Sequence, residues 1–237
     1  MQHIEFLMTT GDKSGGMAGR GDMSLMKAVA RGSQEAFMAL LDRYVELVSR
    51  TSFRILCDRE DSEAVTVKVF TSLWKDVLEY DDRFTLSQWL LRKTYLYSRV
   101  RIVRRRLLRI FGVSTDLFVR ASPKVEDHDD FIVKKAWELF CRASLQMTSL
   151  QSAAYALCAL EGMETREVAR ITGHADFRIS IALQHAYDRI RDELKYLDKD
   201  DDYERFTGFL RKVAESLTDR RHIMAEVRAK LNISDET

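Results

Sequence analysis

Apolar residues recur every three or four positions along most of the chain, the spacing that places side chains on one face of an α-helix. Two long runs carry this pattern, one before and one after the polar break YDDRF, which begins at Tyr80. The same spacing returns after residue 130. We therefore predict an all-α fold. The face-forming positions of the two runs are Phe37, Leu40, Leu41, Tyr44, Leu47, Val48, Thr51 and Ile55, and then Leu86, Trp89, Leu90, Leu96, Val100, Val103, Leu107 and Ile110.

One segment interrupts the helical spacing. DREDSEAVTVKVFTSLW, which begins at Asp58, alternates valines with polar residues as a strand does, yet it ends on Phe70, Leu73 and Trp74 at helical spacing. Aspartate is a preferred helix N-cap, and both Asp58 and Asp61 stand where a cap is needed. We expect a third helix here in spite of the alternation.

The chain divides where the periodicity stops. Five of the ten glycines lie in the first 21 residues, the only proline is Pro123, and the acidic LDKDDD follows the second helical block. Glycine and proline disfavour helix interiors, so these stretches predict boundaries. The predicted parts are a flexible N-terminal arm (1–21), a helical domain (22–110), a linker (111–129), a second helical domain (130–197) and a helical C-terminal extension (198–237).

The second domain contains a helix-turn-helix pattern. Glu164–Ile171 is typical of a short helix, Gly173 supplies a turn, and a longer helix runs from Ala175 or Asp176 to about Leu194. In DNA-binding proteins with this motif, the second helix enters the major groove. Any helical hairpin shares part of the pattern, so it predicts the local fold more firmly than the function.

Composition narrows the function. The 237 residues carry a formal net charge of +1, and no apolar run reaches the length of a membrane span or a secretion signal. Cys57, Cys141 and Cys158 lie far apart, which indicates free thiols in a reducing cytoplasm. The sequence has no glycine-rich phosphate loop, metal-ligand cluster or nucleophile–base pair. We therefore expect a cytoplasmic protein that is not an enzyme and holds neither metal nor cofactor.

One predicted helix is strongly basic. The segment from Phe84 to Ile110 contains eight arginines and lysines and no acidic residue, with Trp89, Tyr95 and Tyr97 interleaved. Arginine forks match phosphate oxygens, and aromatic rings stack on unpaired bases. A solvated basic face and a helix lying on an anionic membrane are the alternatives. We favour nucleic acid, and expect most arginines to face away from the apolar positions of the helix.

The order of these parts resembles the extracytoplasmic-function (ECF) class of bacterial RNA polymerase sigma factors. GSQEAFMALLDRYVELVSRTSFRILCDREDSEAVTVKVFTSLW is similar to region 2 of that family, and LEGMETREVARITG is similar to the first half of its region 4 helix-turn-helix. Trp89, Leu90 and the arginine run are similar to its promoter-melting helix. The resemblance covers about Met23 to Leu197 and implies a region 2-like bundle and a region 4-like domain, with residues 61–77 helical.

The resemblance implies a transcription-initiation factor that binds core RNA polymerase and directs it to promoters. The first domain would open the −10 element and the second would read the −35 element, with promoter DNA, core polymerase and an anti-sigma protein as partners. The implied polymerase-binding residues are Asp61, Glu63, Thr66, Val67 and Lys68, and the implied DNA-binding residues are Trp89, Arg92, Arg99, Arg101, Arg104, Arg105, Arg106, Arg178, Ser180, Gln184 and His185.

Several positions depart from the family pattern and leave a second hypothesis open. A side chain that cannot hydrogen-bond a base edge loses about 1–3 kcal/mol of discrimination. The alternative is a degenerate sigma-like interaction protein without autonomous promoter recognition. The departures are Ala64, Val67 and Lys68 in the polymerase-contact helix, Leu96 and Val100 in the basic helix, and Ser180 and Ala182 in the recognition helix.

Two expectations concern the arrangement of the parts. The C-terminal extension carries two amphipathic faces, which either cap the second domain or cover its DNA-reading face. The linker implies two separately folded domains whose relative placement changes. In the free protein we expect a compact state in which the acidic residues of 126–130 or 198–202 lie near the segment from Arg99 to Arg109.

Overall fold

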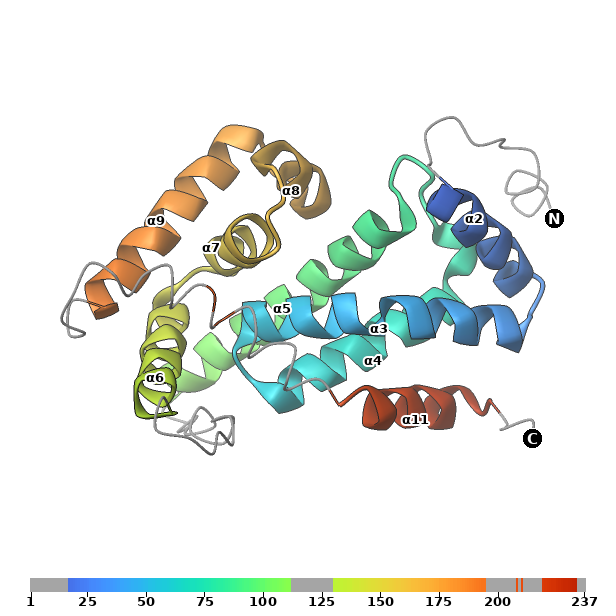
Figure 1. The fold of residues 1–237 in the computed structure, drawn as a ribbon, viewed down its shortest axis with the longest axis horizontal. Helices are drawn as coiled ribbons and strands as arrows, with labels where there is room; N and C mark the ends of the chain where they lie inside the picture. Colours follow the sequence, from blue (N-terminus) through green and yellow to red (C-terminus); the bar gives the residue numbers. More distant parts are fainter. Residues whose placement is uncertain (1–16, 112–129, 195–207, 209, 211–218, 234–237) are drawn as a thin grey trace.

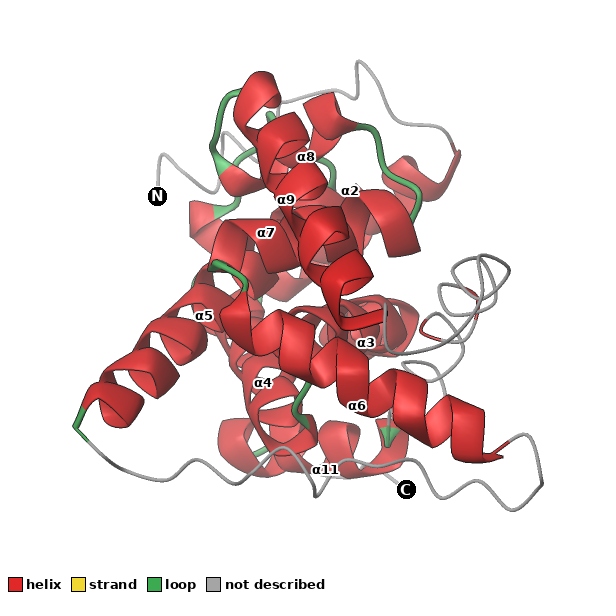
Figure 2. Ribbon diagram, turned by 90° about the vertical axis from the view of Figure 1, so that its left-hand side faces the viewer, coloured by secondary structure: helices red, strands yellow, loops and turns green. Residues whose placement is uncertain are grey.

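The computed structural model describes residues 17–111, 130–194, 208, 210 and 219–233. All secondary structure in these residues is helical, as Figure 2 shows. The prediction of an all-α protein is therefore confirmed for the described part of the chain. No helix in that part is long and apolar enough to cross a membrane.

The first helical block is arranged around α3, which contacts α2, α4 and α5 (Figure 1). Ser33 caps α3 by accepting a hydrogen bond from the Ala36 amide at 3.2 Å. A strongly apolar face then packs against the neighbouring helices. The elements of this block are α2 (Met17–Ala30), α3 (Gln34–Leu56), α4 (Arg59–Lys75), the short 3₁₀ helix η1 (Val77–Glu79) and α5 (Leu86–Ile110).

The first described helix begins before the predicted end of the N-terminal arm. α2 starts at Met17, so residues 17–21 are helical although they include two glycines. Asp22 is buried and accepts hydrogen bonds from Arg43 and Tyr44 of α3. This polar contact joins α2 to α3 and stabilises the helix one turn beyond the sequence prediction. Residues 1–16 of the predicted arm lie outside the described part.

α4 is buried on several sides, and this explains its valine alternation. Asp58 is the N-cap, and its carboxylate accepts from the Asp61 amide at 2.8 Å. Val65, Val67 and Val69 are each at most 2% exposed. Residues two apart on a helix point roughly 200° away from each other, so neighbours are needed on opposite sides. α3, α5 and α11 supply them. The alternation therefore reflects a surrounded helix, and the expected third helix is confirmed.

The second block begins at α6 and contains the helix-turn-helix. Gly173 has a positive φ of 74°, which ends α8 with a left-handed residue as glycine readily allows. The short helix, glycine turn and long helix lie where the sequence predicts them. The elements are α6 (Asp130–Gln146), α7 (Ser149–Ala154), the π-helical segment η3 (Tyr155–Leu160), α8 (Thr165–Thr172) and α9 (Asp176–Leu194).

The two blocks share an interface. Glu161, after η3, accepts a hydrogen bond from Arg50 Nε at 2.8 Å and pairs with Arg54, both on α3. Phe53 stacks on Trp137 of α6 with ring centroids 5.2 Å apart. The blocks are thus joined by polar and apolar contacts in this structure. The acidic segments expected beside the basic helix, and the linker, lie almost entirely outside the described residues.

The described parts of the C-terminal extension pack against different parts of the molecule. Leu210 is buried in an apolar cluster that contains Trp137 and Ile190 of the second block. The helix α11 (Arg220–Leu231) packs against α3 and α4 of the first block (Figure 1). The cluster around Leu210 also contains Phe53 of α3, so Leu210 lies where the two blocks meet. α11 does not cover α9, so that alternative is wrong for the described helix.

Candidate polymerase and nucleic-acid interfaces

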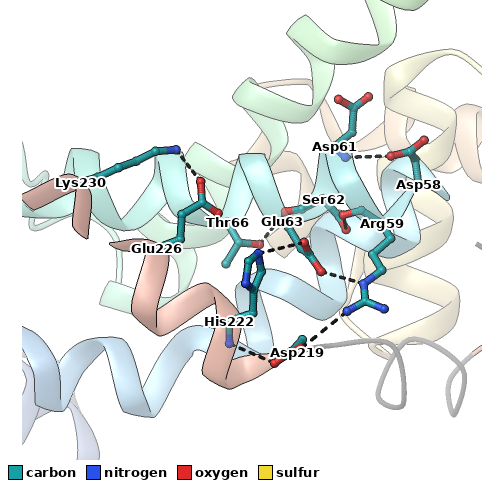
Figure 3. A network of polar contacts seen from close by, with 10 residues as sticks. All are labelled: Asp58, Arg59, Asp61, Ser62, Glu63, Thr66, Asp219, His222, Glu226 and Lys230. Atoms are coloured by element: carbon teal, nitrogen blue, oxygen red, sulfur yellow. Dashed lines mark hydrogen bonds and ion pairs between the residues drawn. The ribbon is translucent and has the colours of Figure 1, made fainter. Parts of the chain in front are cut away.

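The acidic start of α4 is the predicted polymerase-binding surface, and its carboxylates already have partners within the chain. Asp61 pairs with two arginines of α5. Arg59 Nε donates to Glu63 at 2.8 Å, and His222 Nε2 of α11 lies 3.9 Å from the same carboxylate (Figure 3). The side chains of Asp61 and Glu63 remain 20% and 18% exposed. A partner reaches only their outer edges in this state.

Two other predicted polymerase contacts belong to the core. Thr66 and Val67 are fully buried, and the Thr66 hydroxyl donates to the Ser62 carbonyl at 2.8 Å. Neither side chain reaches a partner while its neighbouring helices stay in place. Lys68 is exposed, and its Nζ lies 5.9 Å from the centroid of the Tyr97 ring. The exposed polar candidates on α4 are therefore the edges of Asp61 and Glu63 together with Lys68.

The N-terminal half of α5 uses two predicted DNA contacts internally. Trp89 is 3% exposed and meets Tyr80 edge-on, with centroids 6.0 Å apart. Arg92 Nη1 donates to the Ile171 carbonyl at 3.0 Å, at the end of α8. The last carbonyls of a helix lack helical partners and carry partial negative charge, which favours a cation there. Arg92 thus joins α5 to the helix-turn-helix rather than standing free for DNA.

The C-terminal half of α5 reverses the orientation that the sequence predicts. Val100 is 64% exposed and Ile110 is 76% exposed, although both were expected on the inner face. Tyr95 and Ser98 are buried instead, and their line continues at helical spacing toward Arg101 and Arg105. The outer face of this half carries Leu96, Val100, Val103, Leu107, Ile110 and Phe111, which we call the α5 apolar stripe.

Two carboxylates at the start of α4 explain this reversal. Arg101 Nη1 lies 3.1 Å from Asp61, and Arg105 pairs with Asp61 and lies 3.5 Å from Asp58. Arg105 also donates to the Leu56 carbonyl at 2.9 Å and its side chain is 13% exposed. Desolvation raises the pKa of Asp58, while the Asp61 amide and the Arg105 charge oppose that shift. Buried carboxylates require a cation, so the arginines face inward.

The remaining arginines of the run divide between internal and exposed positions. Arg106 donates to the Met147 carbonyl at the end of α6. Arg99 and Arg104 are exposed. The prediction that most arginines share one solvent face is therefore wrong, because four of the seven arginines of α5 bind within the chain: Arg92, Arg101, Arg105 and Arg106. Among the α5 side chains that the structure describes, Arg99 and Arg104, beside the apolar stripe, are the exposed cations that can reach a phosphate.

α9 exposes the face that a recognition helix would use. Ile179 is fully buried against Val168 and Ile171 of α8, and this packing fixes the angle between the two helices. Ala182 is also buried, so one departure from the family pattern is a core position here. The sequence did not single out Phe177 and Ile181, which are exposed on the same helix. The predicted readers Arg178, Ser180, Gln184 and His185 are all exposed.

His174 marks the place where α5 meets the helix-turn-helix. Its Nε2 lies 3.3 Å from the Tyr95 hydroxyl. Burial lowers the pKa of His174, and the charges of Arg178 and Arg99 lower it further. Arg99 of α5 and Arg178 of α9 therefore both lower the pKa of the same histidine. The sequence did not single out His174, and only its position after Gly173 hints at the junction.

The geometry thus offers three separate surfaces: the acidic start of α4, the exposed stripe and cations of α5, and the outer face of α9. A scan against models of known protein families finds no match to the chain, and a search of curated proteins finds none either.

Proposed function

We propose that the chain is an ECF-type sigma factor that binds core RNA polymerase and directs it to promoters in the bacterial cytoplasm. The observation that carries this proposal is the helix-turn-helix, in which the reading face of α9 is exposed among the described residues. Arg178 and His185 stand seven residues apart on that face. At about 1.5 Å per residue they are separated by roughly 10 Å along the helix, on the order of three base pairs.

The chemistry of the reading face suits base recognition. Arginine donates two hydrogen bonds to guanine, and glutamine both donates to and accepts from adenine. Arg178 and Gln184 supply these groups, and Phe177 and Ile181 supply apolar contacts for a thymine methyl group. The acidic edges of Asp61 and Glu63 support the polymerase contact. The proposed holoenzyme therefore uses α4 for the polymerase and α9 for the −35 element.

A second candidate is a sigma-like interaction protein without autonomous promoter recognition. The observation in its favour is the state of α5. Arg101, Arg105 and Arg106 bind inward, and the stripe around Val100 faces solvent. A helix that opens promoters needs its cations and aromatics turned toward DNA. Under this hypothesis the chain binds polymerase or a regulator and starts no transcription by itself.

Transcription with purified core polymerase and fragmented genomic DNA separates the two candidates. The sigma factor hypothesis predicts discrete transcripts that depend on the chain. The triple variant Arg178→Ala, Gln184→Ala, His185→Ala should lose them while it still binds core polymerase. Arg191→Ala is the matched control, because Arg191 is exposed on the same helix and, among the described residues, its ion pair is with Asp188 of α9 itself. Binding to core polymerase without any transcript would support the second candidate.

A further inference from the structure

The surface formed by α3 and α4 is occupied by a helix from far along the sequence. Ile223 and Val227 of α11 are fully buried and belong to the same apolar cluster as Val65 and Val67 of α4. Their spacing of four residues places both on one face of α11. Ile233, just after α11, is buried in the same cluster. The apolar face of α11 therefore packs against the first block.

The rim of this contact is mostly acidic on the first block and basic on α11. Arg220 pairs with Asp42 and lies 3.3 Å from Glu46, both on α3. His222 lies 3.9 Å from Glu63 on α4. One contact has the opposite sense, because Asp219, the N-cap of α11, lies 3.8 Å from an arginine of α4. The α3–α4 surface can therefore bind an amphipathic helix that carries basic residues beside its apolar face.

The same surface includes the candidate polymerase contact. Glu63 and Arg59, which begin the exposed side of α4, face His222 and Asp219 in Figure 3. Val67, which the family resemblance assigns to the polymerase contact, is in the cluster that α11 completes. A partner that used Glu63 and the adjoining apolar positions would need the space that α11 fills. Two helices cannot occupy one surface together.

We propose that α11 occupies the polymerase-docking surface at rest, and that a basic amphipathic helix of core polymerase displaces it. This inference rests on the proposed function. If the open state is a minor one, the apparent dissociation constant for polymerase rises by the ratio of closed to open chains. Weakening the rim of the α11 contact should therefore strengthen docking, although it removes favourable interactions from the free chain.

The test compares two full-length charge-reversal variants. Arg220→Glu places a carboxylate beside Asp42 and Glu46, whereas Lys230→Glu makes the same charge change on α11 at a residue whose partner is Glu226 of α11 itself. We expect Arg220→Glu to bind core polymerase about three- to tenfold more tightly than the wild type, the effect of one or two exposed ion pairs. Lys230→Glu should bind as the wild type does.

Hydrogen exchange of the wild-type chain supplies a second readout. On addition of core polymerase, the amides of α11 should lose protection while those of α4 keep it. Equal affinities for wild type and Arg220→Glu, with α11 still protected in the complex, would overturn the displacement and leave the proposed function standing. Failure of wild type and variant alike to bind polymerase would overturn the proposed function, and this inference with it.

Discussion

The two halves of α5 contain similar residues, but the N-terminal half buries its apolar residues and the C-terminal half exposes them. In the N-terminal half, Leu86, Trp89 and Leu90 are buried in the core of the first block. In the C-terminal half, the apolar stripe faces outward and Arg101 and Arg105 face inward. The difference lies beneath the helix: an apolar cluster under one half, and the carboxylates of α4 under the other. The partner of a helix, as much as its own sequence, selects the face that is buried.

The largest expected effect separates a leucine of each half. Leu90→Ala should destabilise the protein by about 2–5 kcal/mol, because Leu90 is fully buried and leaves a cavity. Leu107→Ala should change stability by less than about 0.5 kcal/mol, because Leu107 is half exposed. Urea unfolding of both variants measures the difference. Similar losses for the two would show that the apolar stripe is covered and that the comparison is wrong.

A smaller effect is expected from the carboxylates that hold the arginines inward. Asp61→Ala leaves Arg101 and Arg105 without their shared partner and should cost about 1–2 kcal/mol, less than a fully buried pair because Asp61 is partly exposed. Asp82→Ala, at an exposed position before α5, is the matched control. The same unfolding assay applies. An unchanged stability for Asp61→Ala would mean that the ion pairs do not determine the orientation of α5.

The smallest effect is a pH dependence at the junction of the two halves. The pKa of His174 is lowered from 6.5 by burial and by Arg178 and Arg99. The unfolded chain therefore takes up a proton before the folded one, so this stability is complete above pH 6.5 and is lost as the pH falls through the folded pKa. His174→Gln should flatten the unfolding profile in that range. If the stability of the variant depends on pH as steeply as that of the wild type, His174 does not contribute to the pH dependence.

Local features of this fold follow from the sequence, and contacts between distant segments do not. The Asp58 cap, the Gly173 turn and the bounds of α8 and α9 depend on neighbouring residues, so their positions are predicted closely. The inward arginines of α5 depend on carboxylates about 40 residues away in sequence, beyond what periodicity reveals. Val67 belongs to the apolar cluster that includes Ile223 and Val227 of α11, which lie far later in the sequence.

In the candidate site, too, features that depend on local sequence are predicted, and features that depend on distant segments are not. Exposure of Arg178, Gln184 and His185 follows from the amphipathic pattern of α9, and the structure agrees. The polymerase-contact residues came from a family resemblance, which carries no information about an added helix at the C-terminal end. Thr66 and Val67 are buried where the resemblance implies contact, Thr66 beside Ser52 of α3 and Val67 in the apolar cluster that includes residues of α11.

The most direct test of the central claim is binding of the full chain to purified core RNA polymerase, measured by fluorescence anisotropy of a labelled chain. We predict a dissociation constant of about 1 µM or tighter, and a loss of about tenfold or more for Glu63→Lys, equivalent to about 1.4 kcal/mol. Glu79 is exposed at the end of η1, the short helix that follows α4, and Glu79→Lys should bind as the wild type does. No detectable binding of the wild type at micromolar concentrations would contradict the claim.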